Sequence, residues 1–527
     1  MANKADAQEE KRLALQVELD GHKSQAERNK LGQFATPTQL ARDVLAFGLD
    51  LLPKEEAVRF LDPAIGTGSF YSALRSTRRH RPLTWARGFE IDVHYGKPAQ
   101  ELWADEPLQI TFGDFTCQAI PQAEGERANL LICNPPYVRH HHLTGADKVR
   151  LQAAARAAAH VDLSGLAGLY CYFMALAHGW MSEGGVAGWL IPSEFMDVNY
   201  GRALKAYLLR EVTLLHIHRF DPNDVQFDDA LVSSAVVWFK KVKPPVVHAV
   251  TFSYGGTMQK PALSKAVSAR DLECANKWTR FPKQEVEAKH DGYRLGDLFA
   301  IKRGLATGDN GFFILDEDKA RSLKLPQEFL RPILPSTRYI KANEINADAA
   351  GVPLLDKRLF LLDCDRPENE VKRDYPALWA YLQTGVDHVA TRYLCSSRRF
   401  WYAQERRAPA PIVCTYIGRS DHDGRPFRFL LNNSKATATN VYLCLYPQPV
   451  LANRLRQLPE ALRLLWQALN AISKETLLGN GRVYGGGMHK LEPKELANVP
   501  ADDLAAMVGL VTKAQSRQLE LEEVFAS

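Results

Sequence analysis

Between residues 58 and 239, short apolar segments alternate with stretches of helical periodicity, and this alternation limits the folds open to the chain more than any other feature. The apolar segments are too short for helices, and helical stretches lie between several of them. Such alternation is typical of a mostly parallel sheet with helices on both faces. The last two segments have no helix between them and should pair antiparallel at the sheet edge. We predict strands at residues 58–61, 85–89, 109–112, 129–133, 186–191, 214–218 and 234–239.

The length of the chain predicts more than one domain. Its 527 residues exceed what a single hydrophobic core usually organises. The alternation stops at the basic, proline-containing stretch 240–245, which indicates a boundary. We therefore predict an α/β, Rossmann-like domain over residues 1–245 that begins with a helical lead-in, a connecting segment over 246–290, and a mixed α+β domain over 291–527. The last domain should combine short strands, at 312–315, 427–431 and 441–446, with helices such as 458–472.

The composition is that of an ordinary globular protein, with 46% hydrophobic and 24% charged residues. The amino terminus is too charged for a signal peptide, and no run of 18 apolar residues offers a membrane span, so we expect a cytoplasmic protein. The eight cysteines are scattered without a C-x-x-C pair, as is typical of unreactive thiols in a reducing compartment. A formal charge of +5 permits a nucleic-acid partner without identifying one.

A glycine-containing turn follows the first predicted strand, in the sequence DPAIGTG over residues 62–68. Glycines in this turn would let the backbone pass close to a ligand at the carboxyl end of a parallel strand, where open α/β sheets bind nucleotides. The second strand ends at Glu90, a typical distance onward for an acid that accepts hydrogen bonds from ribose hydroxyls. The third ends at Asp114, which could accept a hydrogen bond from an adenine amino group.

Each of these acids alone is more typical of a solvated strand end, and a G-x-G turn alone also suits a dinucleotide fold. Three such signals in sequence order predict a nucleoside-containing ligand. Two apolar side chains, Ile91 and Phe115, would enclose its ring. The predicted contacts are Asp62, Ala64, Gly66, Gly68, Glu90, Ile91, Asp114 and Phe115.

The fourth strand runs directly into Asn134-Pro135-Pro136-Tyr137, a tetrapeptide that is rare by chance in a chain of this length. If the Asn134 side-chain oxygen and the Pro135 carbonyl each accept one N–H of an exocyclic amine, the nitrogen is drawn towards tetrahedral geometry and its lone pair is freed. The prolines would fix the backbone so that the carbonyl faces the site. Tyr137 offers an aromatic face to a base, which must leave a duplex to reach a buried site.

These segments, GQFATP at 32–37, DPAIGTGSF at 62–70, FEID at 89–92, GDF at 113–115 and NPPY at 134–137, resemble in order the TaqI-like class of DNA adenine-N6 methyltransferases. The resemblance implies S-adenosyl-L-methionine as the cofactor, double-stranded DNA as a partner, and a target-recognition domain after the catalytic one. It also implies that residues 32–37 close over the methionine part of the cofactor, with Thr36 as a contact. Phe227 would supply a second aromatic face to the target base.

Basic and glycine-rich segments resemble the DNA-contacting parts of that family, although any one of them could be a plain surface turn. Arg482, His489 and Lys490 suit phosphates or base edges, and Arg139 begins a basic loop after the tetrapeptide. Three consecutive histidines follow Arg139, but adjacent residues in one loop rarely converge on one ion. We therefore predict no metal.

The sequence thus predicts a site-specific DNA methyltransferase acting on N6 of a flipped adenine, either as the modification half of a restriction-modification system or as an orphan methylase. A cognate restriction endonuclease would act separately. Three alternatives remain open: an RNA adenine methylase, an enzyme acting on a protein glutamine amide, and a non-catalytic DNA-binding subunit. The large second domain favours duplex DNA, because specific recognition of a duplex needs substantial surface.

Overall fold

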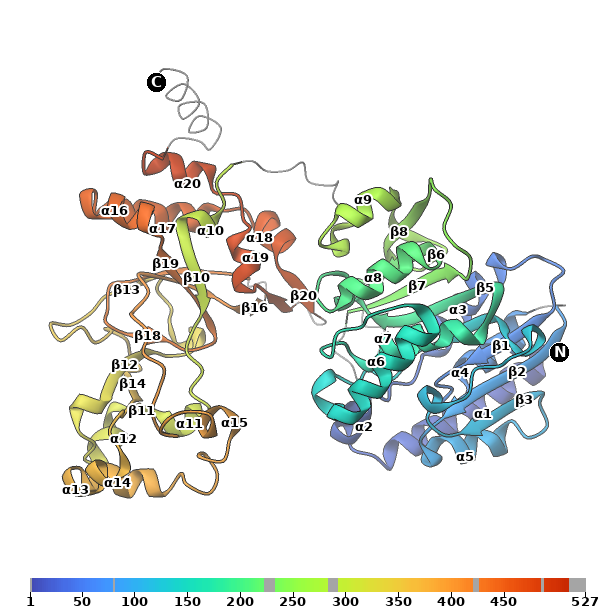
Figure 1. Ribbon diagram of the computed structural model, residues 1–527, viewed down its shortest axis with the longest axis horizontal. Helices are drawn as coiled ribbons and strands as arrows, with labels where there is room; N and C mark the ends of the chain where they lie inside the picture. Colours follow the sequence, from blue (N-terminus) through green and yellow to red (C-terminus); the bar gives the residue numbers. More distant parts are fainter. Residues whose placement is uncertain are drawn as a thin grey trace, which may run out of the picture. The chain divides into compact units, whose positions relative to one another are not determined.

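The computed structural model describes residues 2–78, 81–221, 233–282, 292–419, 426–484 and 488–510. The chain divides into two compact units (Figure 1). Unit 1 comprises Met1–Glu287 with Tyr484–Gly486, and unit 2 comprises Ala288–Val483 with Gly487–Ser527. Within the described ranges, no helix has the length and apolar character needed to cross a membrane.

The described residues of unit 1 form a sheet of nine strands in the order β3-β2-β1-β4-β5-β7-β6-β8-β9. The first five strands in the chain run parallel, and β7 runs antiparallel to both of its neighbours, β5 and β6. The predicted α/β fold with a mostly parallel sheet is confirmed. The strands are β1 (Val58–Asp62), β2 (Leu83–Glu90), β3 (Leu108–Phe112), β4 (Ala128–Cys133), β5 (Met181–Pro192), β6 (Thr213–Arg219), β7 (Ser234–Lys240), β8 (Ala249–Gly256) and β9 (Pro261–Ser268).

The sheet extends beyond the end that the sequence pattern predicts. Residues 249–268, expected in a connecting segment, form β8 parallel to β6 and β9 antiparallel to β8. The predicted domain end at residue 245 is therefore corrected, and the β6–β7 pair lies inside the sheet and not at its edge. The reason is physical: β8 buries Val250 and Phe252, whereas β9 is mostly exposed and carries no apolar run that would reveal it.

Helices cover both faces of this sheet because successive strand side chains point to opposite sides. Phe60 and Leu130 belong to one core, which α3 (Thr38–Leu51), α4 (Ser69–Thr77) and α5 (Val93–Leu102) complete. Leu61 and Leu131 belong to the other core, with α6 (Gly145–Ala159), α7 (Leu169–Ala177) and α8 (Gly201–Arg210). The amino-terminal helices are α1 (Ala2–Gly21) and α2 (Gln25–Leu31), and α9 (Ala269–Cys274) follows β9.

Unit 2 is a mixed α+β structure with sheets of five, four and three strands among its described residues, in the orders β10-β19-β15-β17-β13, β11-β14-β12-β18 and β16-β21-β20. Its strands are β10 (Phe299–Arg303), β11 (Ile314–Asp316), β12 (Leu330–Leu334), β13 (Glu344–Ile345), β14 (Leu359–Leu362), β15 (Ile412–Thr415), β16 (Ile417–Arg419), β17 (Phe429–Asn432), β18 (Thr437–Ala438), β19 (Tyr442–Pro447), β20 (Arg482–Tyr484) and β21 (Met488–Lys490).

Helices of unit 2 are short, and one of them replaces part of a predicted strand. The sequence pattern predicts a strand over residues 312–315, but the Asp309 side chain accepts the Phe312 backbone N–H at 3.1 Å and starts a helical turn that includes residues 312 and 313. The helices are α10 (Leu295–Leu298), α11 (Asn310–Phe313), α12 (Glu317–Ser322), α13 (Glu368–Asp374), α14 (Pro376–Gln383), α15 (Tyr393–Ser396), α16 (Pro449–Gln457), α17 (Ala461–Ala471), α18 (Lys474–Asn480), α19 (Pro493–Ala497) and α20 (Asp502–Met507).

Candidate active site

The turn after β1 contains two glycines, and the space around them differs. Gly66 has a φ of +54°, and a Cβ added there would meet nothing within 4 Å, so its backbone borders open space. Gly68 has a φ of +90°, and an added Cβ would lie 2.6 Å from the indole nitrogen of Trp103. That nitrogen donates to the Thr67 carbonyl at 3.0 Å. Gly66 therefore leaves room for a ligand, whereas Gly68 leaves room for the core.

Two acids support this turn from the ends of their strands. The Asp62 carboxyl accepts the Ala64 backbone N–H at 3.1 Å, and burial raises the pKa of Asp62 to about 8. Asp62 is thus a buried, turn-forming group. Glu90 accepts the backbone N–H groups of Gly66 at 3.0 Å and Asp92 at 2.8 Å, and burial also raises its pKa. A carboxylate has about four acceptor positions, so Glu90 keeps capacity for ribose hydroxyls.

The third strand end places Asp114 and Phe115 in different surroundings. One Asp114 oxygen accepts both the N–H and the hydroxyl of Thr116, at 2.8 and 2.7 Å, and the other lies 3.5 Å from an Arg150 nitrogen. Phe115 is only 2% exposed and packs among core aromatic rings. Ile91, by contrast, is 68% exposed. Ile91 is thus open to a nucleobase, whereas contact of the buried Phe115 with one stays a prediction.

Helix α1 holds the glycine turn in place, a feature that sequence reasoning missed. The Thr67 hydroxyl accepts a hydrogen bond from Arg12 at 3.1 Å and donates to Gln16 at 2.6 Å. Arg12 is 1% exposed and forms an ion pair with Glu9 at 2.7 Å. The helical spacing of Glu9, Arg12 and Gln16 was the available signal, but a face built of polar residues does not look buried in a sequence.

Asn134, at the end of β4, has one half of its amide paired and the other half unpaired. Its Nδ2 donates to the Phe34 carbonyl at 3.1 Å and to the Thr36 hydroxyl at 3.2 Å. Its Oδ1 is buried and has no hydrogen-bond partner among the described residues. Because the Phe34 carbonyl can only accept, the amide orientation is determined and the oxygen is left as a fixed acceptor.

The GQFATP and NPPY segments form one structural unit. Gly32 has a φ of +67°, its carbonyl accepts the Tyr137 N–H at 3.3 Å, and a Cβ added there would lie 2.3 Å from the Tyr137 nitrogen. The Tyr137 hydroxyl donates to the Leu190 carbonyl at 3.1 Å, and its ring centroid lies 5.6 Å from that of Phe34. Thr36, predicted as a cofactor contact, is 5% exposed and holds Asn134. In this structure Thr36 therefore positions the Asn134 amide, and its contact with the cofactor stays a prediction.

The other residues that the sequence predicts for the target site are Pro135, Arg139 and Phe227. Pro135 is buried beside Asn134, and Arg139 is exposed just before the turn His140–His142. Phe227 lies outside the described residues. Within the part of the chain that the structure describes, no group of three or more His, Cys, Asp or Glu side chains is arranged to hold a metal ion.

Arg482, His489 and Lys490, the predicted DNA contacts of unit 2, lie on β20 and β21. Arg482 forms an ion pair with Glu495 at 2.8 Å, and Lys490 forms one with Glu492 at 2.7 Å. Burial lowers the pKa of His489. Both cations are thus already partnered by carboxylates, and a phosphate would have to compete for them.

Comparison with known proteins adds two family matches. Residues 76–226 match the model of the Eco57I restriction-modification methylase, and residues 279–525 match that of the type II methyltransferase M.Eco57I, C-terminal domain. M.AccI, a type II methyltransferase of Acinetobacter calcoaceticus, is 26% identical over 512 residues, covering 93% of this chain and 88% of that protein. M.XamI of Xanthomonas campestris pv. amaranthicola, also a type II methyltransferase, is 27% identical over 479 residues, covering 89% and 84% respectively.

One solved structure is similar in fold across both units of the chain. It is the type IIL restriction-modification enzyme MmeI in complex with DNA, with a TM-score of 0.51 and 13% sequence identity. The similarity covers 90% of this chain and 72% of that one.

Proposed function

The chain belongs to the type II restriction-modification DNA methyltransferases, and from this premise we propose that it methylates N6 of an adenine flipped out of a specific duplex sequence. The observation that carries the proposal is the buried Oδ1 of Asn134, which has no partner in the described chain while both hydrogens of its Nδ2 are engaged. A fixed acceptor of this kind suits an exocyclic amine.

The residues at the strand ends fit S-adenosyl-L-methionine. Gly66 borders open space, Glu90 keeps acceptor capacity for ribose hydroxyls, and Asp114 can accept from an adenine amino group. When bound, the cofactor supplies an activated methyl group on a sulfonium. Its nucleoside part would be held by Glu90, Ile91 and Asp114.

Asn134 and Pro135 then act on the target amine. The Asn134 oxygen and the Pro135 carbonyl each accept one N–H. The nitrogen is thereby drawn towards tetrahedral geometry, and its lone pair is no longer delocalised into the base ring. As positive charge develops on the nitrogen, both hydrogen bonds strengthen, which lowers the barrier without tightening the ground state equally. The proton that the methylated nitrogen then loses can pass to water. Tyr137 and, as a proposal, Phe227 would offer faces to the flipped base.

The fixed Asn134 oxygen would serve a protein glutamine amide or an RNA adenine equally well. Family membership and the size of unit 2 favour duplex DNA, because sequence-specific recognition needs substantial surface. A cognate restriction endonuclease acting separately also belongs to this proposal.

The decisive experiment incubates the purified protein with methyl-labelled cofactor and duplexes of random sequence, and then sequences the methylated products. We expect N6-methyladenine within one defined motif. Parallel reactions contain RNA or a glutamine-containing protein in place of the duplexes. Label in either of these but not in DNA would contradict the proposal, as would the absence of label in all three. The same assay applied to Asn134→Ala tests the role of the fixed oxygen. Asn199→Ala, at an exposed asparagine of the same unit, is its matched control.

A further inference from the structure

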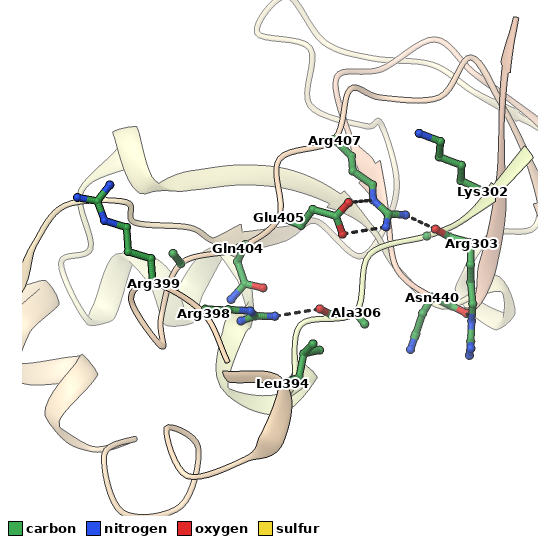
Figure 2. A pocket seen from close by; sticks show the side chains of 12 residues that line it. Lys302, Arg303, Ala306, Leu394, Arg398, Arg399, Gln404, Glu405, Arg407 and Asn440 are labelled. Atoms are coloured by element: carbon green, nitrogen blue, oxygen red, sulfur yellow. Dashed lines mark hydrogen bonds and ion pairs between the residues drawn. The ribbon is translucent and has the colours of Figure 1, made fainter. Parts of the chain in front are cut away.

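Unit 2 contains a pocket of about 800 Å³ that none of the predicted functional residues lines (Figure 2). Three separate segments form it: residues 302–306 at the end of β10, residues 394–407 from α15 onward, and Asn440 before β19. Five of its lining side chains are Lys or Arg, and only Glu405 is acidic. The pocket therefore suits an anionic ligand.

Gln404 is the unusual residue of this pocket. It is 7% exposed, and both its side-chain oxygen and its side-chain nitrogen are buried without a hydrogen-bond partner in the described parts of the chain. Burying an amide with neither group paired is costly, so such groups in native proteins usually have a partner. The Gln404 backbone is held firmly, because its N–H donates to the Asp363 carboxylate at 2.8 Å. Asp363 in turn forms an ion pair with Arg331 at 2.8 Å.

The cations around Gln404 differ in how far they are engaged. Arg407 forms two hydrogen bonds with Glu405, at 2.7 and 2.8 Å, so its positive charge is balanced by that carboxylate. Arg398 donates through one nitrogen to the Ala306 carbonyl at 3.0 Å, while its other terminal nitrogen is buried and unpartnered among the described residues. Lys302 and Arg399 are exposed at the pocket. In the view of Figure 2, Arg399 lies on one side of Gln404, and Arg407 and Lys302 lie on the other.

The side chain of Gln404 offers one donor group and one acceptor, and this limits the class of ligand that could pair with both. A phosphate only accepts hydrogen bonds, so it would satisfy the Gln404 nitrogen and the arginines but leave the Gln404 oxygen unpaired. The major-groove edge of adenine carries a donor, N6, beside an acceptor, N7, and glutamine pairs with both. The corresponding edge of guanine offers only acceptors, and that of cytosine only a donor.

We propose that this pocket reads part of the DNA recognition sequence, with Gln404 pairing to the major-groove edge of one adenine and Lys302, Arg398 and Arg399 binding the flanking phosphates. The proposal rests on the proposed function, since it names residues that would select the duplex to be methylated. Phosphate contacts orient the duplex and the base contact specifies it.

Gln404→Met tests the base contact, because methionine keeps the side-chain length and removes both hydrogen-bonding groups. Sequencing of randomised duplexes methylated by the full-length variant should show discrimination reduced about tenfold to a hundredfold at one base pair, with the other positions retained. The matched control is Gln383→Met, at an exposed glutamine at the end of α14, which should leave the motif unchanged. An unchanged motif in Gln404→Met would overturn the proposal.

Gln404→Glu provides a second measurement that does not depend on the first variant folding. A carboxylate accepts but does not donate, so preference at the same position should move from adenine towards cytosine, whose N4 donates. An adenine preference equal to that of the unsubstituted protein would refute the contact. If the unsubstituted protein methylates a defined motif and neither variant alters it, only this inference fails. If it methylates no DNA, the proposed function fails.

The phosphate contacts have a separate signature. Lys302→Ala combined with Arg399→Ala should weaken binding to all duplexes alike and reduce the slope of log Kd against log salt by about 0.9 for each phosphate that is no longer bound. Lys319→Ala combined with Arg321→Ala, on exposed residues of α12, is the control pair. Equal slopes for the two double variants would show that the pocket does not bind phosphate.

Discussion

Two amide side chains with buried polar atoms, Asn134 in unit 1 and Gln404 in unit 2, differ in how much of each amide the protein itself engages. Asn134 has both amino hydrogens donated, so a single fixed oxygen remains. Gln404 has neither polar atom engaged by another described residue, so a donor and an acceptor remain side by side. One acceptor suits stabilisation of charge that develops on an amine, whereas a donor–acceptor pair suits recognition of a base edge.

The two amides also differ in what holds them. Asn134 is fixed through its own side chain, by Phe34 and Thr36 from a distant segment. Gln404 is held at its backbone N–H by Asp363, and no described residue forms a hydrogen bond with its side-chain amide. Catalytic groups need tighter placement than recognition groups, because small displacements cost rate steeply. The comparison therefore predicts that changes around Asn134 affect turnover and changes around Gln404 affect selectivity.

The largest effect should come from Asn134→Ala. Loss of the fixed oxygen should lower kcat by at least about a hundredfold, as removal of one preorganised hydrogen-bonding group does in other enzymes. Cofactor affinity, measured by calorimetry, should be unchanged because Glu90 and Asp114 remain. Turnover near that of the Asn199→Ala control would break the contrast between the two amides.

Tyr137→Ala should have the next largest effect. Removal of the ring takes away a stacking face, which should weaken capture of the flipped base about tenfold, measured with a fluorescent base analogue at the target position. Tyr137→Phe keeps the ring and removes only the hydrogen bond to the Leu190 carbonyl, so it should retain most of the binding. Equal losses in the two variants would mean that the hydroxyl and not the ring matters.

Thr36→Val should have a moderate effect on kcat with little change in KM. The substitution removes one of the two acceptors that orient the Asn134 amide, and a hydrogen bond of this kind is worth about threefold to tenfold in rate. Thr36→Ser, which keeps the hydroxyl, should restore the rate. If Thr36→Val instead weakened cofactor binding with kcat unchanged, Thr36 would be the cofactor contact that the sequence resemblance implies.

Combined alanine substitution of Arg482, His489 and Lys490 should have the smallest effect. Because Arg482 and Lys490 are already paired with Glu495 and Glu492, we expect DNA affinity to fall by less than about tenfold. The change in salt slope should be smaller than that of the Lys302 and Arg399 double variant. A larger change would place the main phosphate contacts on β20 and β21 instead of in the pocket of unit 2.

Local patterns were sufficient to predict much of unit 1. The seven strands predicted from apolar runs correspond to β1–β7, and NPPY lies directly after β4 as expected. Polar contacts between distant segments were not predictable in the same way. The link from Arg12 to Thr67 and the link from Thr36 to Asn134 join residues that no local pattern connects. Strand β9 was missed because its exposed face carries no apolar alternation.

Consecutive residues alone therefore identified the short segments that carry the chemistry: the glycine turn, the acids at two strand ends and NPPY. These could be recognised because each depends on the backbone geometry of a few neighbours. The folded chain was needed to show that polar atoms of Asn134 and Gln404 have no hydrogen-bond partner among the described residues. Burial and pairing depend on side chains brought together from far apart in the chain, and a linear pattern carries no record of them.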